Sequence, residues 1–126
     1  MDDDAPLKDL VWVGSSKRAF REFPEAVKDD MGYALFRAQE GKEHPSAKAL
    51  QGFTGRGILE VVEHHDGNTY RAVYTVKFSS GIYVLHAFQK KSKKGIATPK
   101  QELDLMKKRL KDAEILHEAR SKKESK

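Results

Sequence analysis

A carboxylate, an arginine and a group of lysines occur within a short stretch of this chain and could together act on a phosphate. Glu60 interrupts one apolar run, Arg71 lies inside the next, and Lys90 and Lys91 follow a third. A guanidinium is a planar fork of donors that suits phosphate or carboxylate, and a carboxylate can accept a proton. The pattern indicates either acid–base chemistry on a phosphate or a Glu60–Arg71 salt bridge. The salt bridge is the commoner outcome, and the two roles are compatible.

A lysine cluster lies just past the end of the third apolar run and consists of Lys90, Lys91, Lys93 and Lys94. Like charges this close repel one another unless an anion lies among them, so the cluster is either a phosphate-binding site or a flexible basic loop. Phe88 precedes it and either stacks on a nucleobase or closes the core. Strand alternation puts Arg71, Val73, Thr75 and Lys77 on one face of their strand.

The remaining polar residues predict no metal or nucleotide chemistry. His64 and His65 stand at a hairpin end and are expected to face solvent, whereas His86 lies in an apolar strand and is expected to be a hydrogen-bonded core residue. No two histidines have a zinc-ligand spacing, and no phosphate-loop or dinucleotide motif is present. We therefore expect no metal and no cofactor. The run 107–109 (KKR) is predicted to be a solvated helix face.

The composition limits the classes of protein to which this chain can belong. The chain of 126 residues has no cysteine and a net charge of +5, with residues 1–66 at −4 and residues 67–126 at +9. This asymmetry favours an anionic partner such as nucleic acid for the second half, or else reflects a solvated helix and a basic tail. The acidic N-terminus does not resemble a signal peptide, and there is no run of about 18 apolar residues. A cytoplasmic protein without membrane contact is expected.

The first forty residues are predicted to form a strand and a helical hairpin. The apolar run 10–13 is typical of a strand. Ser15 and Ser16 are N-cap residues for a helix that reaches Phe23, and Pro24 suits the first turn of a second helix. Apolar residues three and four apart give that helix one stripe, at Val27, Met31, Leu35 and Ala38. The polar segment 42–57 is predicted to be a loop.

Three strands and a helix are expected next. The strands span 58–64, 69–78 and 82–89, with turns at 66–68 and 79–81 where positive φ is expected. Thr98 to Gln101 reads as a capping box, followed by a buried stripe of Leu103, Met106, Leu110 and Ala113. The fold class is α+β: an N-terminal strand and helical hairpin, a three-stranded antiparallel meander and a C-terminal helix. We expect the helices to cover one sheet face and leave the other open for a ligand.

These segments resemble the RelE/HigB-type toxins of bacterial toxin–antitoxin systems, and in particular the phage-derived HigB-like subgroup. Residues 8–23 (KDLVWVGSSKRAFREF) match the opening strand and helix, and 57–63 with 70–76 (YRAVYTV) match the central strands. Residues 83–91 (YVLHAFQKK) and 98–110 (TPKQELDLMKKRL) match the last strand and closing helix. On this basis we predict one toxin domain at 8–120, a loose tail at 1–7 and a frayed basic tail at 121–126.

The resemblance implies a metal-independent endoribonuclease that cuts mRNA in the ribosomal A site and so inhibits translation. It implies the catalytic residues Glu60, Arg71, Lys90 and Lys91, and the RNA-binding residues Lys77, Phe88, Gln89, Lys93 and Lys94. The partners it implies are a HigA-like helix-turn-helix antitoxin, the ribosome with its mRNA, and operator DNA through the antitoxin complex. The chain lacks the tyrosine or histidine that some relatives carry after the last strand, so the general acid is unassigned.

Two other functions stay open at this point. One is a ParE-like toxin that binds DNA gyrase without a nuclease site. The other is a degenerate toxin that acts only as an antitoxin partner or operon co-regulator. The set of Glu60, Arg71, Lys90 and Lys91 favours the nuclease, because a gyrase-binding toxin has no reason to gather a carboxylate, an arginine and lysines on one sheet face.

Overall fold

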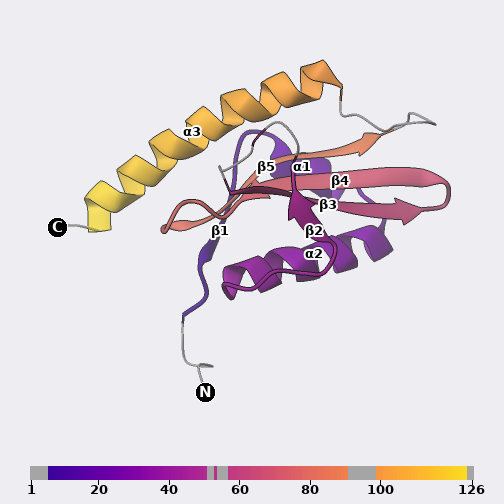
Figure 1. Cartoon of the computed structure of the whole chain (residues 1–126), viewed down its shortest axis with the longest axis horizontal. Helices are drawn as coiled ribbons and strands as arrows, with labels where there is room; N and C mark the ends of the chain where they lie inside the picture. The colour runs from indigo at the N-terminus through magenta and orange to yellow at the C-terminus, as the bar shows by residue number, and fades with distance from the viewer. Residues whose placement is uncertain (1–5, 51–52, 54–56, 91–98, 125–126) are drawn as a thin grey trace.

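The computed structural model of the chain describes residues 6–50, 53, 57–90 and 99–124. Its elements are β1 (Asp9–Trp12), α1 (Ser16–Arg21), α2 (Glu25–Gln39), β2 (Ala47–Ala49), β3 (Ile58–His65), β4 (Asn68–Thr75), β5 (Gly81–Lys90) and α3 (Lys100–Glu124). The strands form one sheet in the order β1-β5-β4-β3-β2 (Figure 1). β1 runs parallel to β5, and the other neighbours are antiparallel. This arrangement confirms the predicted α+β class, with the meander of β3, β4 and β5 at its centre.

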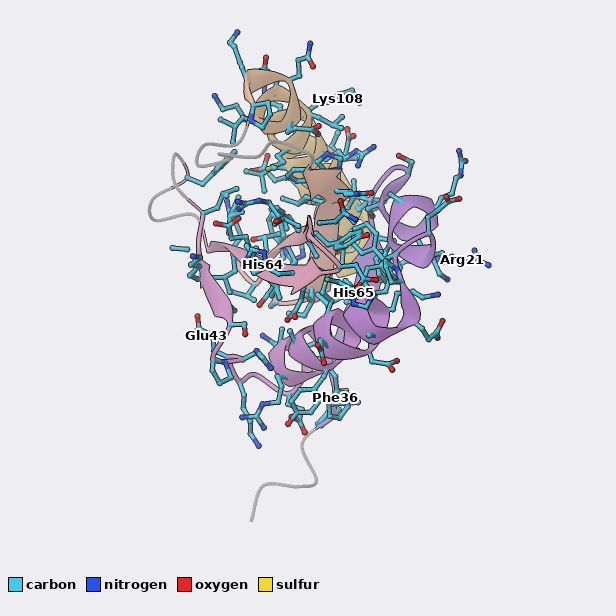
Figure 2. All side chains as sticks on the ribbon, turned by 90° about the vertical axis from the view of Figure 1, so that its right-hand side faces the viewer. Arg21, Phe36, Glu43, His64, His65 and Lys108 are labelled. Carbon is cyan, nitrogen blue, oxygen red and sulfur yellow. The ribbon has the colours of Figure 1, made fainter. Side chains whose placement is uncertain are left out.

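Helices cover both faces of the sheet, so the prediction of one open face was wrong. α2 packs on one face and α3 on the other, and Figure 2 shows Phe36 of α2 and Lys108 of α3 on opposite sides of the strands. The reason lies in β5, whose Ile82 and Val84 belong to the apolar cluster under α2. Tyr83 and Leu85 alternate with these two residues along β5 and belong to the cluster under α3. A strand buried on both faces reads as a continuous apolar run, and such a run demands cover on each side.

The predicted helical stripes are confirmed. Met31, Leu35 and Ala38 of α2 are buried against the sheet. On α3, Met106, Leu110 and Ala113 are buried, and Leu103 packs against the same cluster at its edge. Apolar side chains at intervals of three and four residues place one face of each helix on the core, and this burial holds the helices on the sheet.

The two predicted turns have different geometries. Asp66 and Gly67 have φ values of 51° and 79°, as a two-residue hairpin turn of type I′ requires. No residue of the second turn, 79–81, has a positive φ, so that expectation was wrong. Gly81 is instead required by packing, because a Cβ there would lie 2.9 Å from the Asp9 carbonyl oxygen of β1.

The segment 42–57 contains a strand that sequence patterning missed. β2 pairs with the middle of β3 in antiparallel register, with Lys48 opposite Glu60. It has only three residues, which are half-buried or exposed, so it is too short to give a strand pattern within the polar segment. The strand forms because the edge of β3 offers unpaired backbone groups.

The helix starts differ in detail from their predicted caps. Ser15 is the N-cap of α1 but makes no side-chain capping bond, and Pro24 occupies the N-cap of α2. α3 begins at Lys100, where the amides of Glu102 and Leu103 donate to the Pro99 carbonyl. The predicted cap Thr98 lies outside the described residues. None of the helices in the described ranges is long and apolar enough to span a membrane.

Candidate functional site

Glu60 and Arg71 form a largely buried ion pair on one face of the sheet. Arg71 Nη1 donates to Glu60 Oε1 at 2.6 Å, and the two side chains are only 12% and 11% exposed. Glu60 lies opposite Val73 and Arg71 lies opposite Val62, so the pair is a diagonal contact between β3 and β4. The salt bridge expected from the sequence is confirmed.

The pair lies on the sheet face that α3 covers. Val73, two residues from Arg71 on the same side of β4, packs in the cluster with Met106 and Leu110 of α3. Within the described residues, Arg71 Nε has no hydrogen-bond partner. A guanidinium carries five N–H donors in a fixed plane, so an arginine bound to one carboxylate oxygen through Nη1 keeps donors for an anion. The Glu60 carboxylate therefore anchors the guanidinium through Nη1, and Nε is buried.

Phe88 lies beside the pair, opposite Arg71 in the pairing of β4 with β5. Its half-buried ring stacks on His86, with ring centroids 4.7 Å apart and planes inclined by 22°. Gln89 is exposed and lies opposite Tyr70. The backbone of Lys90 closes β5 opposite Thr69. Lys91, Lys93 and Lys94 lie outside the described residues, so the structure tests nothing about the predicted lysine cluster.

Lys77 does not join this group. It follows the far end of β4, about 20 Å along an extended chain from Arg71. Its ammonium lies 3.7 Å from Glu114 of α3 and 5.2 Å from the centre of the Phe78 ring. The predicted face is correct, but the opposite end of the strand carries this lysine away from Glu60 and Arg71.

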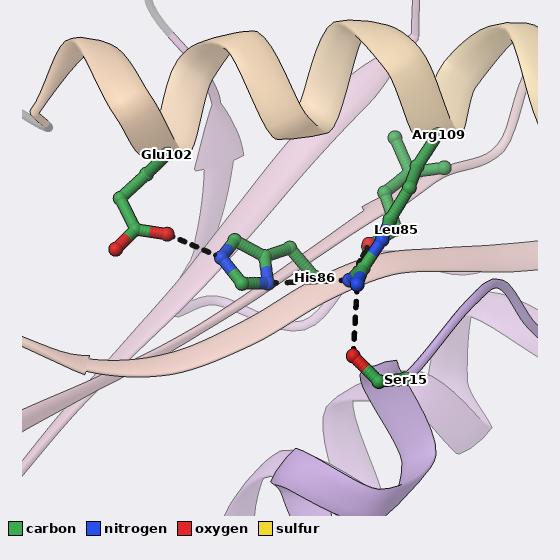
Figure 3. A network of polar contacts seen from close by, with 5 residues as sticks. All are labelled: Ser15, Leu85, His86, Glu102 and Arg109. Carbon is green, nitrogen blue, oxygen red and sulfur yellow. Dashed lines mark hydrogen bonds and ion pairs between the residues drawn. The ribbon is translucent and has the colours of Figure 1, made fainter.

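A network that the sequence did not predict joins Arg109, His86, Glu102 and Ser15 (Figure 3). It lies next to Phe88, whose ring stacks on His86. Arg109 of α3 is only 8% exposed, so its assignment to a solvated helix face was wrong. It donates to the Leu85 carbonyl at 3.0 Å and to Ser15 Oγ at 2.8 Å, and its Nη1 lies 3.4 Å from His86 Nδ1. This arginine therefore joins α3 to β5 and to the start of α1.

The partners of His86 fix which of its nitrogens carries the proton. Arg109 can only donate, so the Nδ1 that faces it accepts, and the proton resides on Nε2. His86 Nε2 then donates to Glu102 Oε1 at 2.5 Å. Burial lowers the pKa of His86, Glu102 raises it and Arg109 lowers it, and the net shift is downward. His86 is the hydrogen-bonded core residue that was expected.

The position of Arg109 on its helix and the glycine at position 14 are both related to the burial of this arginine. Arg109 follows Met106 by three residues, which puts it beside the buried stripe of α3. Gly14 has a φ of +60°, and a Cβ there would lie 2.8 Å from Arg109 Nε. The glycine after the first strand thus makes room for the guanidinium, but a single sequence does not reveal which distant side chain fills that room.

The other histidines stand apart from the pair. His64 is exposed and contacts Thr69 Oγ1 at 3.1 Å, and His65 is half-buried beside Asp66. Both lie at the end of the β3–β4 hairpin (Figure 2). In the described ranges, no group of three or more histidine, aspartate or glutamate side chains could hold a metal ion.

Comparisons with known proteins agree with this architecture. Residues 18–111 match the family described as Phage derived protein Gp49-like (DUF891). No curated protein sequence matches the chain. The structure is similar to that of the E. coli toxin RelE, a double mutant solved in the free state, with a TM-score of 0.50 and 15% identity. That likeness covers 71% of this chain and 90% of RelE, and it shows a shared fold.

The family match spans most of the chain, and the solved structure supplies the fold. The resemblance to RelE/HigB-type toxins that the sequence indicated is confirmed at the level of family and fold. The chain belongs to the Gp49-like family of phage-derived proteins and has the α+β fold of the RelE-type toxins.

Proposed function

We propose that this protein is the toxin of a toxin–antitoxin system and that it cuts mRNA on the ribosome. The observation that carries the proposal is the Glu60–Arg71 pair at 2.6 Å, with Phe88 directly opposite Arg71. A carboxylate, a guanidinium with free donors and an aromatic ring in one place are the groups needed to handle a nucleic-acid phosphate and its neighbouring base.

Cleavage in this site uses the RNA's own 2′-hydroxyl as the nucleophile. Glu60 accepts the 2′-hydroxyl proton while the oxygen attacks the adjacent phosphorus. Arg71 stabilises the charge that develops on the phosphate oxygens. The P–O5′ bond breaks, and the leaving oxygen takes a proton from Lys90, Lys91 or water. The products are a 2′,3′-cyclic phosphate and a 5′-hydroxyl, and no metal takes part in these steps.

The remaining assignments follow from the same proposal. Lys93 and Lys94 bind the RNA backbone beside the cut, and Gln89 flanks it. In the cell a HigA-like helix-turn-helix antitoxin binds the toxin, and the pair contacts operator DNA through the antitoxin. The protein acts in the cytoplasm, where translating ribosomes are found.

The test is a reconstituted translation reaction with purified protein and a defined mRNA. The expected result is cutting of ribosome-bound mRNA, with cyclic phosphate and 5′-hydroxyl ends. We expect Arg71→Ala to lower the cutting rate about 10²–10³-fold. Arg37→Ala serves as the control, because Arg37 lies on α2 and pairs with Glu40. Products with 5′-phosphate ends, or equal cutting by both variants, would contradict the mechanism.

A further inference from the structure

An open pocket lies between α1 and the edge of β5 that faces away from β4. Its volume is about 560 Å³, within the range of about 300–1,000 Å³ found for ligand pockets. Phe23 and Tyr70 supply aromatic walls, with their rings edge to face and their centroids 4.9 Å apart. Ala19 and Ala87 also line the pocket, and their small side chains leave the space open. Such a pocket suits an apolar side chain of a binding partner.

The pocket is separate from the Glu60–Arg71 site. Tyr70 and Ala87 lie on the sheet face that α2 covers, in the same apolar cluster as Phe23. Arg71 points to the other face, because successive residues of a strand alternate. A partner bound in this pocket therefore does not need to contact the phosphate that is proposed to lie on Arg71.

Beside the pocket, the edge of β5 is open to a further strand. β1 pairs only with residues 81–84 of β5, and no other strand in the described ranges lies against that edge. The two-residue turn makes 65 and 68 a hydrogen-bonded pair of β3 and β4. Because such pairs alternate, Phe88 bonds to β4 and the backbone groups of Gln89 point away from it. Gln89 is exposed, so an extended chain can pair with its backbone.

The rim of the pocket on the α1 side is basic. Arg18 lines the pocket, and the exposed Lys17 and Arg21 lie beside it on the same helix (Figure 2). Glu22 is the acidic residue of the lining, so these four residues together carry a charge of +2. Positive charge favours an acidic partner. The open strand edge favours a peptide over a nucleic acid, because a nucleic acid has no backbone amides to pair with it.

We propose that an extended, acidic segment of a partner protein docks here. Its backbone pairs with the edge of β5 at Gln89. One apolar side chain fills the pocket between Phe23 and Tyr70, and neighbouring carboxylates face the cations of α1. In this mode of recognition the backbone bonds supply affinity and the side-chain pocket supplies specificity. The inference goes beyond the proposed function, because it needs neither RNA nor the ion pair on β3 and β4.

The probe is a displayed library of short random peptides, selected for binding to the folded full chain. We expect the enriched peptides to share one large apolar residue with aspartate or glutamate close to it. No enrichment, or a consensus that is basic, would overturn the proposal.

Variants of the protein then locate the binding site of an enriched peptide, with dissociation constants measured by fluorescence anisotropy. Arg18→Glu should weaken binding about tenfold, because it sets a carboxylate against the acidic peptide. Ala19→Leu should weaken binding about tenfold or more, since the added carbons fill the pocket. Arg18 is exposed, so its variant carries the test alone if Ala19→Leu does not fold.

Lys111→Glu is the matched control, because Lys111 is exposed on α3 and the variant makes the same change of charge. Its dissociation constant should stay within about twofold of the wild type. Equal losses in Arg18→Glu and Lys111→Glu would reduce the effect to net charge and overturn the site.

The strand pairing and the class of partner have tests of their own. Methylating single amides of the peptide should weaken binding strongly at the position that pairs with Gln89, and an effect at no position would overturn the pairing. Single-stranded RNA that displaces the peptide and loses affinity in Ala19→Leu would overturn the proposal in favour of nucleic acid. The peptide should bind Arg71→Ala as tightly as the wild type, and weaker binding there would place it at the phosphate site instead.

Discussion

The Glu60–Arg71 pair is a buried pair of charged side chains, and its burial has a cost in free energy. Removing a charged pair from water costs free energy that the ionic attraction only partly recovers. Replacing both residues by apolar ones of similar size would often stabilise a fold of this kind. The pair is mostly buried, at 2.6 Å, in a sheet whose other buried side chains are largely apolar or aromatic. The energetics of burial therefore give this pair little value for stability, which is compatible with the proposed role in catalysis.

Glu60→Gln tests the proton-accepting role directly. Glutamine keeps the shape and an oxygen that accepts from Arg71, so the fold should persist, but it cannot take a proton. The cutting rate should fall about 10²–10⁴-fold, as the loss of a general base does. Glu63→Gln is the control, because Glu63 is on the same strand with Asp30 nearby. Equal rates for the two variants would remove Glu60 from the mechanism.

His86 gives the protein a stability that depends on pH. Its pKa is lowered from 6.5 in the folded protein, mainly by burial. The unfolded chain therefore binds the proton more readily than the folded one, so stability is full well above pH 6.5 and falls as the pH drops through 6.5 toward the lowered pKa of the folded state. Urea midpoints across this range measure the fall.

His86→Phe separates this effect from that of the other titrating groups. Phenylalanine keeps an aromatic ring next to Phe88 but has no proton to bind, so its midpoint should change less over the same range. A variant that loses stability on acidification as steeply as the wild type would place the cause elsewhere.

At the scale of elements, α3 is held by more than its apolar stripe. Arg109 contacts β5 through the Leu85 carbonyl and α1 through Ser15. Arg109→Met removes these bonds and leaves the buried Leu85 carbonyl without this donor. It should lower the free energy of unfolding by about 2–4 kcal/mol, measured by urea titration. Lys107→Met, at an exposed position two residues earlier, should change it by less than about 0.5 kcal/mol. Similar losses for both would mean that the network carries no stability.

The elements also show what the sequence could and could not predict. The periodicity of apolar residues predicted α2, α3 and the three central strands, because their buried residues recur at the spacing of a helix or a strand. β2 was missed because its three residues, half-buried or exposed, are too few to show such a spacing. The cover on both sheet faces was missed although the continuous apolar run of β5 requires it, because that run was treated as buried on one face only.

The candidate site was predictable to the extent that it depends on strand register. Glu60 and Arg71 were paired from two alternating strands, and the structure places them at 2.6 Å. Arg109, Glu102 and Ser15 were not predicted to meet, because their contact joins residues 94 positions apart and follows from how α3 docks. Lys77 was placed on the correct face but at the wrong end, which a face assignment alone cannot distinguish.

At the scale of the whole molecule, positive charge is concentrated in the second half of the chain. Residues 1–66 carry a net charge of −4 and residues 67–126 carry +9. The positive half includes Arg71, β5 and α3, so it faces the proposed RNA.

The most direct test of the central claim is to express the wild type and Arg71→Ala in growing bacteria and map mRNA 5′ ends. The account predicts growth arrest with new cuts in reading frame for the wild type, and neither for Arg71→Ala at equal protein level. Arrest without new cuts, unchanged by the substitution, would contradict it and point to a target other than mRNA.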